Sequence, residues 1–302
     1  MTIDKLPTSA LTVGVRRLSK VLGFRETNDF ILWLVFAGSL FAFSLWRLPL
    51  INFWGVFCNE TGGPRGSMPG ECFYYTKQWR YRIGIILHLA TVLPASLLAC
   101  TQFVPRLRQK AMRLHRINGY ISVVLAILGT AGAVMIARRT AGGGVDVQSV
   151  VGVLAILFVG ALTKAIISIR HKQIQQHRAW MIRAWAYGGV IVSTRIALFV
   201  AAVTVTYVGG VYVALPCAKI SHSIGEEAMM TLYPQCAPFF AGGHSDHHIA
   251  IEADLRGNVV QSIAALNATF GTAVWVPLLV HMIGAELYLY FTSLEYQRLK
   301  NK

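Results

Sequence analysis

The stretch VQSVVGVLAILFVGALTKAIISI, residues 147–169, contains one charged residue and no proline. About twenty such residues in a helix cross the hydrocarbon core of a bilayer, which is about 30 Å thick. Blocks of similar length and apolarity cover 30–50, 83–104, 117–137, 184–208 and 272–291. Of the 302 residues 55% are hydrophobic and 14% are charged, so water cannot solvate most of the chain. The sequence predicts an all-α integral membrane bundle of six transmembrane helices.

Lys and Arg are unevenly distributed among the segments that join these helices. The segments before the first helix, between the second and third, between the fourth and fifth, and after the sixth contain 17 Lys or Arg and 4 acids, whereas the other joining segments contain 8 of each. Basic residues concentrate in cytoplasmic loops, so we expect both termini to be cytoplasmic. The net charge of +15 then faces anionic lipid and not nucleic acid. Membrane lipid is the expected partner.

This pattern divides the chain into three regions. Residues 1–29 form a cytoplasmic lead, 30–292 a transmembrane domain with outer loops at 51–82 and 209–260, and 293–302 a cytoplasmic tail. The lead mixes apolar and basic residues, which suits either an amphipathic helix on the inner leaflet or a disordered tail. The predicted location is a multi-pass position in a membrane.

Four of the five cysteines lie in the outer loops, two in each: Cys58 and Cys72 in the first, Cys217 and Cys236 in the last. An oxidising compartment favours disulfides there. Pairing could run within or between the loops, since four cysteines allow three connectivities. Asn59 begins a glycosylation sequon in the first outer loop. Together these features predict a disulfide-bearing glycoprotein of the endomembrane system or the plasma membrane.

Ionisable residues inside the apolar blocks are the main candidates for chemistry. Each costs on the order of 3 kcal/mol in the bilayer, so such residues usually face the bundle interior. Counting about 1.5 Å per residue places His88, Arg195 and His281 in one layer, where we expect them to form a catalytic site. The same count places Lys164 and Glu286 at equal depth. We expect these two to form an ion pair, which either fixes helix registry or relays charge.

Two similar motifs begin helices at the inner boundary of the membrane. The first contains His115 and Arg116, and the second contains His177, Arg178 and Arg183. Backbone N–H groups at a helix N-terminus favour anions. These five residues are therefore expected to bind phosphate head groups or an acidic ligand, with plain interfacial anchoring as the alternative.

The order of these residues resembles a family of predicted multi-pass membrane proteins of unknown function found in bacteria and filamentous fungi. The resemblance covers about 83–200 and implies a shared intramembrane site without supplying a reaction. The outer-loop cysteines have no counterpart in the shorter bacterial pattern. The elements that carry the resemblance are His88, Gln102-Phe103 with Arg106, His115-Arg116 with Gly119-Tyr120, the run from His177 to Arg183, and Ser193-Thr194-Arg195.

A looser resemblance concerns haem b. Two imidazoles from different helices at one depth can clamp the iron, and the chain offers His115 with His177 and His88 with His281. This layout is similar to that of the four-histidine, two-haem, ascorbate-dependent membrane cytochromes. It departs from them because the outer partner would come from the sixth helix. The resemblance implies haem ligation, with Arg195 neutralising a propionate, whereas an intramembrane histidine that only bonds a neighbour is the alternative.

These observations favour a membrane-bound enzyme or redox protein, such as an oxidoreductase, that acts on a lipophilic small molecule. The fungal resemblance adds a role in secondary metabolite biosynthesis. A second hypothesis is a non-catalytic carrier or proton-coupled transporter in which Lys164 and Glu286 relay charge. A third is an accessory structural membrane protein.

Overall fold

The computed structural model describes residues 10–24, 26–59, 66–240 and 247–300. In this part of the chain six helical spans are long and apolar enough to cross a membrane, which confirms the predicted fold class. The fifth and sixth are longer than the sequence predicted. The six spans are Thr27–Ile51, Trp79–Gln102, Met112–Ile136, Val145–Arg170, Ile174–Val208 and Val259–Ser293.

The chain forms two compact units, one of residues 1–48 and 91–127 and the other of residues 49–90 and 128–302. Two long helices, α5 (Trp79–Gln102) and α7 (Met112–Ile136), contribute to both. Helices are the expected solution in lipid because they satisfy the backbone hydrogen bonds internally. Large apolar side chains such as Ile156, Phe199 and Val280 point outward from the spans, as lipid contact requires.

The first unit begins with α1 (Ala10–Leu22), which lies within the expected lead. It is followed by α2 (Thr27–Trp33), a π-helical turn at Leu34–Gly38 and α3 (Ser39–Arg47), which together form the first span. The second half of α5, α6 (Pro105–Lys110) and the first half of α7 complete this unit. The side-chain amide of Asn118 joins the two long helices by donating to the carbonyl of Leu98 at 3.2 Å and to the hydroxyl of Thr101 at 2.8 Å.

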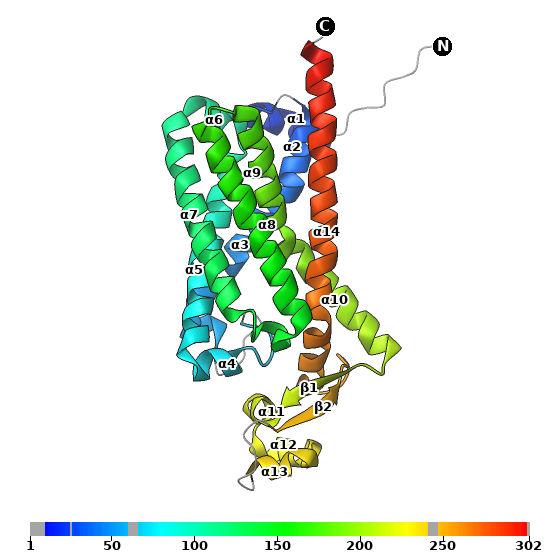
Figure 1. The fold of residues 1–302 in the computed structure, drawn as a ribbon. Helices are drawn as coiled ribbons and strands as arrows, with labels where there is room; N and C mark the ends of the chain where they lie inside the picture. The colour runs from blue at the N-terminus through cyan, green and yellow to red at the C-terminus, as the bar shows by residue number, and fades with distance from the viewer. Residues whose placement is uncertain (1–9, 25, 60–65, 241–246, 301–302) are drawn as a thin grey trace, which may run out of the picture. The chain divides into compact units, whose positions relative to one another are not determined.

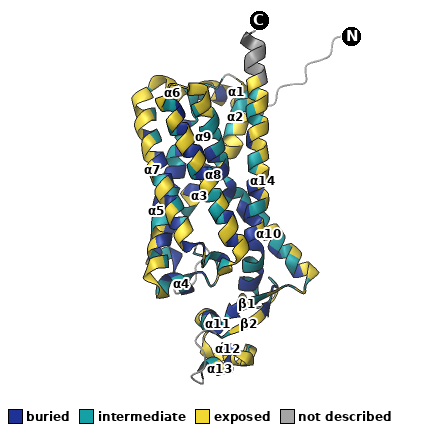
Figure 2. Cartoon of the chain, viewed as in Figure 1, coloured by how far each residue is buried: buried dark blue, intermediate teal, exposed yellow. Residues whose placement is uncertain are grey.

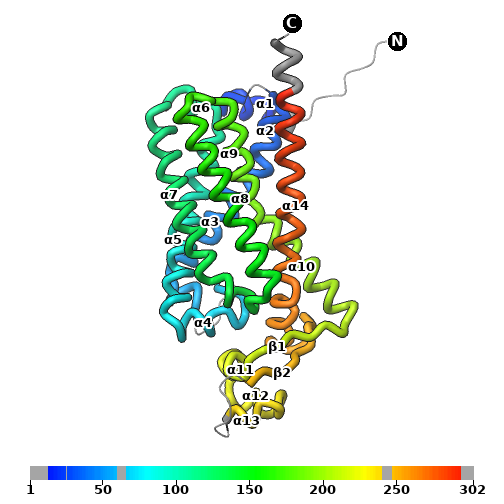
Figure 3. The backbone as a smooth tube through the Cα atoms, in the orientation of Figure 1, coloured from blue at the N-terminus to red at the C-terminus, as the bar shows by residue number. Residues whose placement is uncertain are grey.

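The second unit contains the last three spans, formed by four helices: α8 (Val145–Arg170), α9 (Ile174–Gly188) with α10 (Val190–Val208), and α14 (Val259–Lys300). Helix α14 packs along α8, α9 and α10 and is the longest element (Figure 1; Figure 3). It continues through most of the region that the sequence assigned to a cytoplasmic tail. Short helices Leu48–Ile51, Phe53–Phe57 and α4 (Cys72–Lys77) occupy the first outer loop.

The last outer loop is a small folded subdomain, which the sequence did not predict. Strand β1 (Tyr212–Pro216) pairs antiparallel with β2 (His248–Glu252), with Ala214 opposite Ala250. Between the strands lie α11 (Cys217–Ile224), α12 (Glu226–Leu232), the short helix Pro234–Cys236 and α13 (Ala237–Phe240). Its buried core includes Ile220, Met229 and Ile251 and continues onto the start of α14, which is dark blue in Figure 2.

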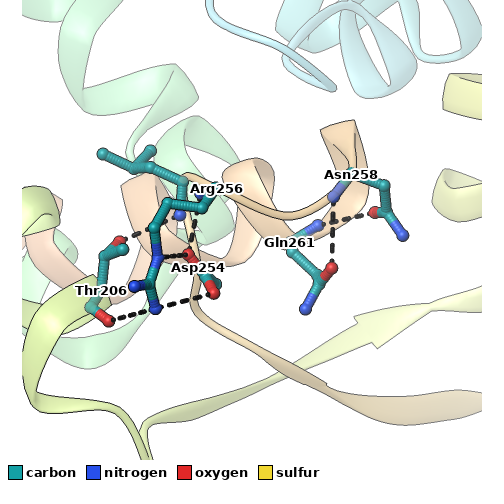
Figure 4. A network of polar contacts seen from close by, with 6 residues as sticks. Thr206, Asp254, Arg256, Asn258 and Gln261 are labelled. Atoms are coloured by element: carbon teal, nitrogen blue, oxygen red, sulfur yellow. Dashed lines mark hydrogen bonds and ion pairs between the residues drawn. The ribbon is translucent and has the colours of Figure 1, made fainter.

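Helix α14 begins with a capping box, shown in Figure 4. The side-chain oxygen of Asn258 accepts from the backbone N–H groups of Val260 and Gln261, while Gln261 accepts from the N–H of Asn258. This reciprocal arrangement satisfies donors that would otherwise have no partner at a helix start. Beside it Arg256 bonds Asp254 and the carbonyl of Thr206 at the end of α10.

Both outer loops contain a disulfide, as the sequence predicted. Cys58 pairs with Cys72, and Cys217 pairs with Cys236, so the connectivity within each loop is the one adopted. The remaining Cys100 is buried in the second span. The Asn59 side chain is exposed, but the other residues of its sequon lie outside the described residues, so glycosylation stays a prediction.

Candidate functional site

His88 lies where α5 and α7 approach each other closely. A Cβ on Gly132 would stand 2.6 Å from the backbone nitrogen of His88 and 2.7 Å from the carbonyl oxygen of Gly84, so only glycine fits there. This contact lets the Nδ1 atom of His88 reach the carbonyl oxygen of Gly129 at 2.8 Å. A carbonyl only accepts, so Nδ1 carries the hydrogen. The neutral imidazole therefore has its basic lone pair on Nε2.

Arg195 of α10 is brought to the same region from a different span. Its guanidinium is close enough to His88 for their charges to interact. It also interacts with the carboxylate of Glu71, and its Nη1 points at the sulfur of Met68 at 3.9 Å. The residues near Arg195 thus include Glu71, which the sequence analysis did not select, whereas the expected catalytic layer stays a prediction.

Glu71 is the centre of a buried polar cluster. Its Oε1 accepts from the backbone N–H of Ala141 at 2.7 Å, and its Oε2 accepts from the hydroxyl of Tyr75 at 3.1 Å. Tyr75 in turn bonds Thr140 at 2.9 Å. The opposite charge comes from Lys219 of α11, whose side chain is 1% exposed. We call Glu71, Tyr75, Arg195 and Lys219 the outer charge cluster.

Burial dominates the electrostatics of the outer charge cluster. It raises the pKa of Glu71 above its ordinary range, against the opposing effects of Lys219, the Ala141 N–H and Tyr75. It likewise lowers the pKa of Lys219, against the effect of Glu71. The side chain of Lys219 packs tightly, since a Cβ on Gly70 would stand 2.8 Å from its Cε. The attraction between the two groups thus offsets only part of the cost of their burial, and the Nζ atom of Lys219 makes no hydrogen bond within the described part of the chain.

His281, the third residue of the expected layer, has a clear structural role. The long fifth span is interrupted at Gly189, between α9 and α10. The Nδ1 atom of His281 donates to the carbonyl of Ala186 at 2.7 Å, and its Nε2 accepts from the Ser193 hydroxyl at 2.8 Å. Ser193 and Arg195 leave the helix about 200° apart, which argues against one shared face. Convergence of His281 with His88 and Arg195 stays a prediction.

The expected ion pair between Lys164 and Glu286 is wrong. Glu286 is instead bound by Arg183 of α9, through Nε to Oε1 at 2.6 Å and Nη2 to Oε2 at 2.7 Å. A planar guanidinium matches both carboxylate oxygens, which a lysine ammonium cannot do. Lys164 is exposed on α8. The charge relay of the transporter hypothesis would therefore require this two-point contact to open.

The second inner motif joins helices in this structure. His177 bonds the carbonyl of Ala165 in α8 at 2.9 Å, and Arg178 donates to the hydroxyl of Tyr288 in α14 at 3.3 Å. Arg183, besides binding Glu286, lies 4.7 Å above the ring of Trp180. These contacts favour the anchoring alternative for this motif.

The anion-binding interpretation of both motifs has less support than the sequence suggested. His115 and His177 occupy the fourth residues of α7 and α9, and their backbone N–H groups already donate to the carbonyls of Ala111 and Gln173. Arg116 and Arg178 are exposed. Ligand binding by these motifs stays a prediction.

The residues fit haem poorly at the outer pair. Both ring nitrogens of His281 are engaged by protein atoms, so iron would have to displace Ser193. His115 belongs to the first unit and His177 to the second. Among the described residues no group of three or more His, Cys, Asp or Glu could hold a metal ion. We derive no chemistry through haem.

The fold and this site define a polytopic membrane protein with a buried polar cluster in its second unit. Residues 85–221 match a protein family described as a predicted membrane protein (DUF2306). The chain is 26% identical over 310 residues to "Ava biosynthesis cluster protein G" from Aspergillus versicolor, across 89% of this chain and 90% of that protein. No solved structure matches. The expected similarity to predicted membrane proteins and to a fungal protein is confirmed at this level, whereas the cytochrome resemblance is not.

Sequence reasoning missed Glu71, Tyr75 and Lys219 because all lie in outer loops, where charged residues usually face water. A usable signal was present. Glu71 directly precedes Cys72, and Lys219 follows Cys217 by two residues. Lys219 is also the single Lys or Arg between residues 209 and 255.

Proposed function

We propose that this integral membrane protein is an enzyme that transfers a proton on a lipophilic small molecule in a fungal biosynthetic pathway. The observation that supports the proposal is the His88 imidazole, whose hydrogen is fixed on Nδ1 by the Gly129 carbonyl and which lies within electrostatic range of Arg195. The printed name of the Aspergillus versicolor relative, a biosynthesis cluster protein, supports the pathway.

The chemistry follows from the two side chains. The Nε2 lone pair of His88 takes a proton from a carbon next to a substrate carbonyl, and the bonding electron pair moves onto the carbonyl oxygen. Arg195 stabilises the negative charge that develops on that oxygen. The imidazolium then returns the proton to a different atom, so substrate and product have equal mass and no oxidant is consumed.

Glu71 and Met68 act as positioning residues for Arg195 in this scheme. The backbone N–H of Ala141 holds the carboxyl group of Glu71, which attracts the guanidinium of Arg195. Arg195→Lys would retain the charge but lose the planar fork, so we expect partial activity from it and none from Arg195→Ala.

The test is complementation of a strain that lacks this protein. We expect His88→Ala and Arg195→Ala to lose one product and to accumulate an isomer of the same mass, measured by chromatography with mass spectrometry. Matched controls are His171→Ala and Arg170→Ala, which change exposed residues at the end of α8.

Two results would refute the proposal. The first is an unchanged product profile for His88→Ala and Arg195→Ala at unaltered protein levels. The second is an accumulated precursor whose mass differs from that of the product, because a proton transfer conserves mass.

A further inference from the structure

We propose that α1, α6 and the start of α7 form a binding surface for anionic phospholipid head groups. This basic platform belongs to the first unit, so the proposal is independent of catalysis at His88 and Arg195. Its members are all exposed: Arg16, Arg17, Lys20, Arg106, Arg108, Lys110, Arg113 and Arg116.

Helix α1 has the amphipathic character of an interfacial helix. At 100° per residue, Arg16, Arg17 and Lys20 fall within about 100° of one another. The exposed apolar side chains Leu18 and Val21 lie beside this charged face, and Val13 is exposed as well. Apolar residues flanked by cations suit a position at the boundary between acyl chains and head groups.

Helix α1 is attached to the membrane-spanning part of its unit. The Nη1 atom of Arg106 in α6 donates to the carbonyl of Val21 in the last turn of α1, at 2.7 Å. Gly23 follows with φ +84°, and a Cβ there would stand 3.1 Å from the backbone nitrogen of Arg106. Phe24 then packs against Phe30 of α2, with ring centroids 5.6 Å apart. These contacts favour the helix over the disordered tail for this part of the lead.

The charge balance identifies the occupant. Within the described part of this unit the acidic residues are Glu26 and Asp29, against the eight cations of the basic platform. Exposed cations beside exposed apolar side chains complement a surface that has anionic groups above a hydrophobic layer. A leaflet rich in anionic phospholipid has that chemistry, and attraction to it adds up over the cations.

The experiment uses the full chain in nanodiscs, with Val13→Cys carrying an environment-sensitive fluorophore. Cys100 is buried and the other cysteines form disulfides, so labelling is directed to position 13. Replacing part of the phosphatidylcholine with phosphatidylserine should shift the emission to the blue and increase its quenching by nitroxide lipids. High salt should reverse the shift in the unaltered protein, because screening weakens exposed charges.

Two triple variants distinguish a specific effect of the basic platform from a general effect of removing three positive charges. Arg108→Gln, Lys110→Gln and Arg113→Gln together should raise the phosphatidylserine fraction needed for the shift, with an upper bound of about 100-fold in affinity. The matched control changes exposed cations of the second unit, Lys77, Arg80 and Arg138, to Gln and should behave as the unaltered chain. Equal emission in both lipids, or equal effects of the two triple variants, would overturn the proposal.

Discussion

Replacing Lys219 by Met tests whether the outer charge cluster holds the two outer loops in place. The side chain is 1% exposed and that of Glu71 is 6% exposed, so neither can turn to water in the folded protein. Met preserves the apolar stem that packs against Gly70 and removes only the ammonium. The variant therefore leaves a buried carboxylate whose remaining cation is Arg195.

The expected loss is moderate, because Lys219 attracts Glu71 but its Nζ atom makes no hydrogen bond to any described residue. The cost of about 3–5 kcal/mol for breaking a buried ion pair is therefore an upper limit, and we expect a loss of about 1–3 kcal/mol. At roughly 2–3 °C per kcal/mol for a chain of this size, the melting temperature should fall by about 2–9 °C. The double variant Glu71→Gln and Lys219→Met should recover most of this, since a neutral pair carries no uncompensated charge.

The loss should depend on pH. Burial already raises the pKa of Glu71, and removal of Lys219 removes an effect that lowers it. A carboxyl whose folded pKa is raised contributes stability that is present below its unfolded pKa, near 4.5, and is lost as pH rises through the folded pKa. The difference in melting temperature between Lys219→Met and the unaltered protein should therefore become smaller as pH falls from 7 towards 4.5.

The assay is thermal unfolding of the detergent-purified protein at one fixed heating rate, from pH 4.5 to pH 7. Arg256→Gln serves as the control, because it breaks an exposed ion pair and should leave the melting temperature unchanged. The reasoning is refuted if Lys219→Met has the same melting temperature as the unaltered protein at pH 7. A double variant that is less stable than both single variants would also contradict it.

Three further outcomes can be checked by the same measurement. Gly132→Ala should destabilise by about 1–3 kcal/mol, because the added methyl meets backbone, while Gly160→Ala, with open space around it, should be neutral or slightly stabilising; equal effects would contradict the close helix contact. Asn258→Ala should cost about 1 kcal/mol through loss of the α14 cap, and an unchanged melting temperature would show that the capping box is dispensable. Glu286→Gln should lower stability, and adding Arg183→Gln should restore part of it; an additive loss would refute their coupling.

The fold could be predicted from the sequence to the extent that the bilayer determines it. Apolar length gave all six spans, because lipid permits few alternatives to a helix. The same criterion failed where α9 and α14 continue into polar sequence, since protein contacts and not apolarity set those ends. The strands β1 and β2 were missed because their pairing depends on a contact between segments far apart in the chain.

The candidate site was predictable in part for a related reason. Depth counting gave Glu286 the wrong partner, because depth says nothing about which face of a helix a side chain occupies, while the layer of His88, Arg195 and His281 stays a prediction. Arg183 lies on the face of α9 that meets α14, whereas Lys164 is exposed on α8. The motif's role in joining helices could not be read from spacing alone.

The burial of Glu71 against Lys219 also has a consequence for biogenesis. A ribosome delivers the first outer loop well before the last, so the early disulfide can close while the lysine that will neutralise its neighbour has not yet been synthesised. Until α11 is synthesised, the Glu71 carboxyl group lacks the nearby ammonium that offsets part of the cost of its burial. Burial of Glu71 next to Lys219 is therefore a late event in the synthesis of the chain.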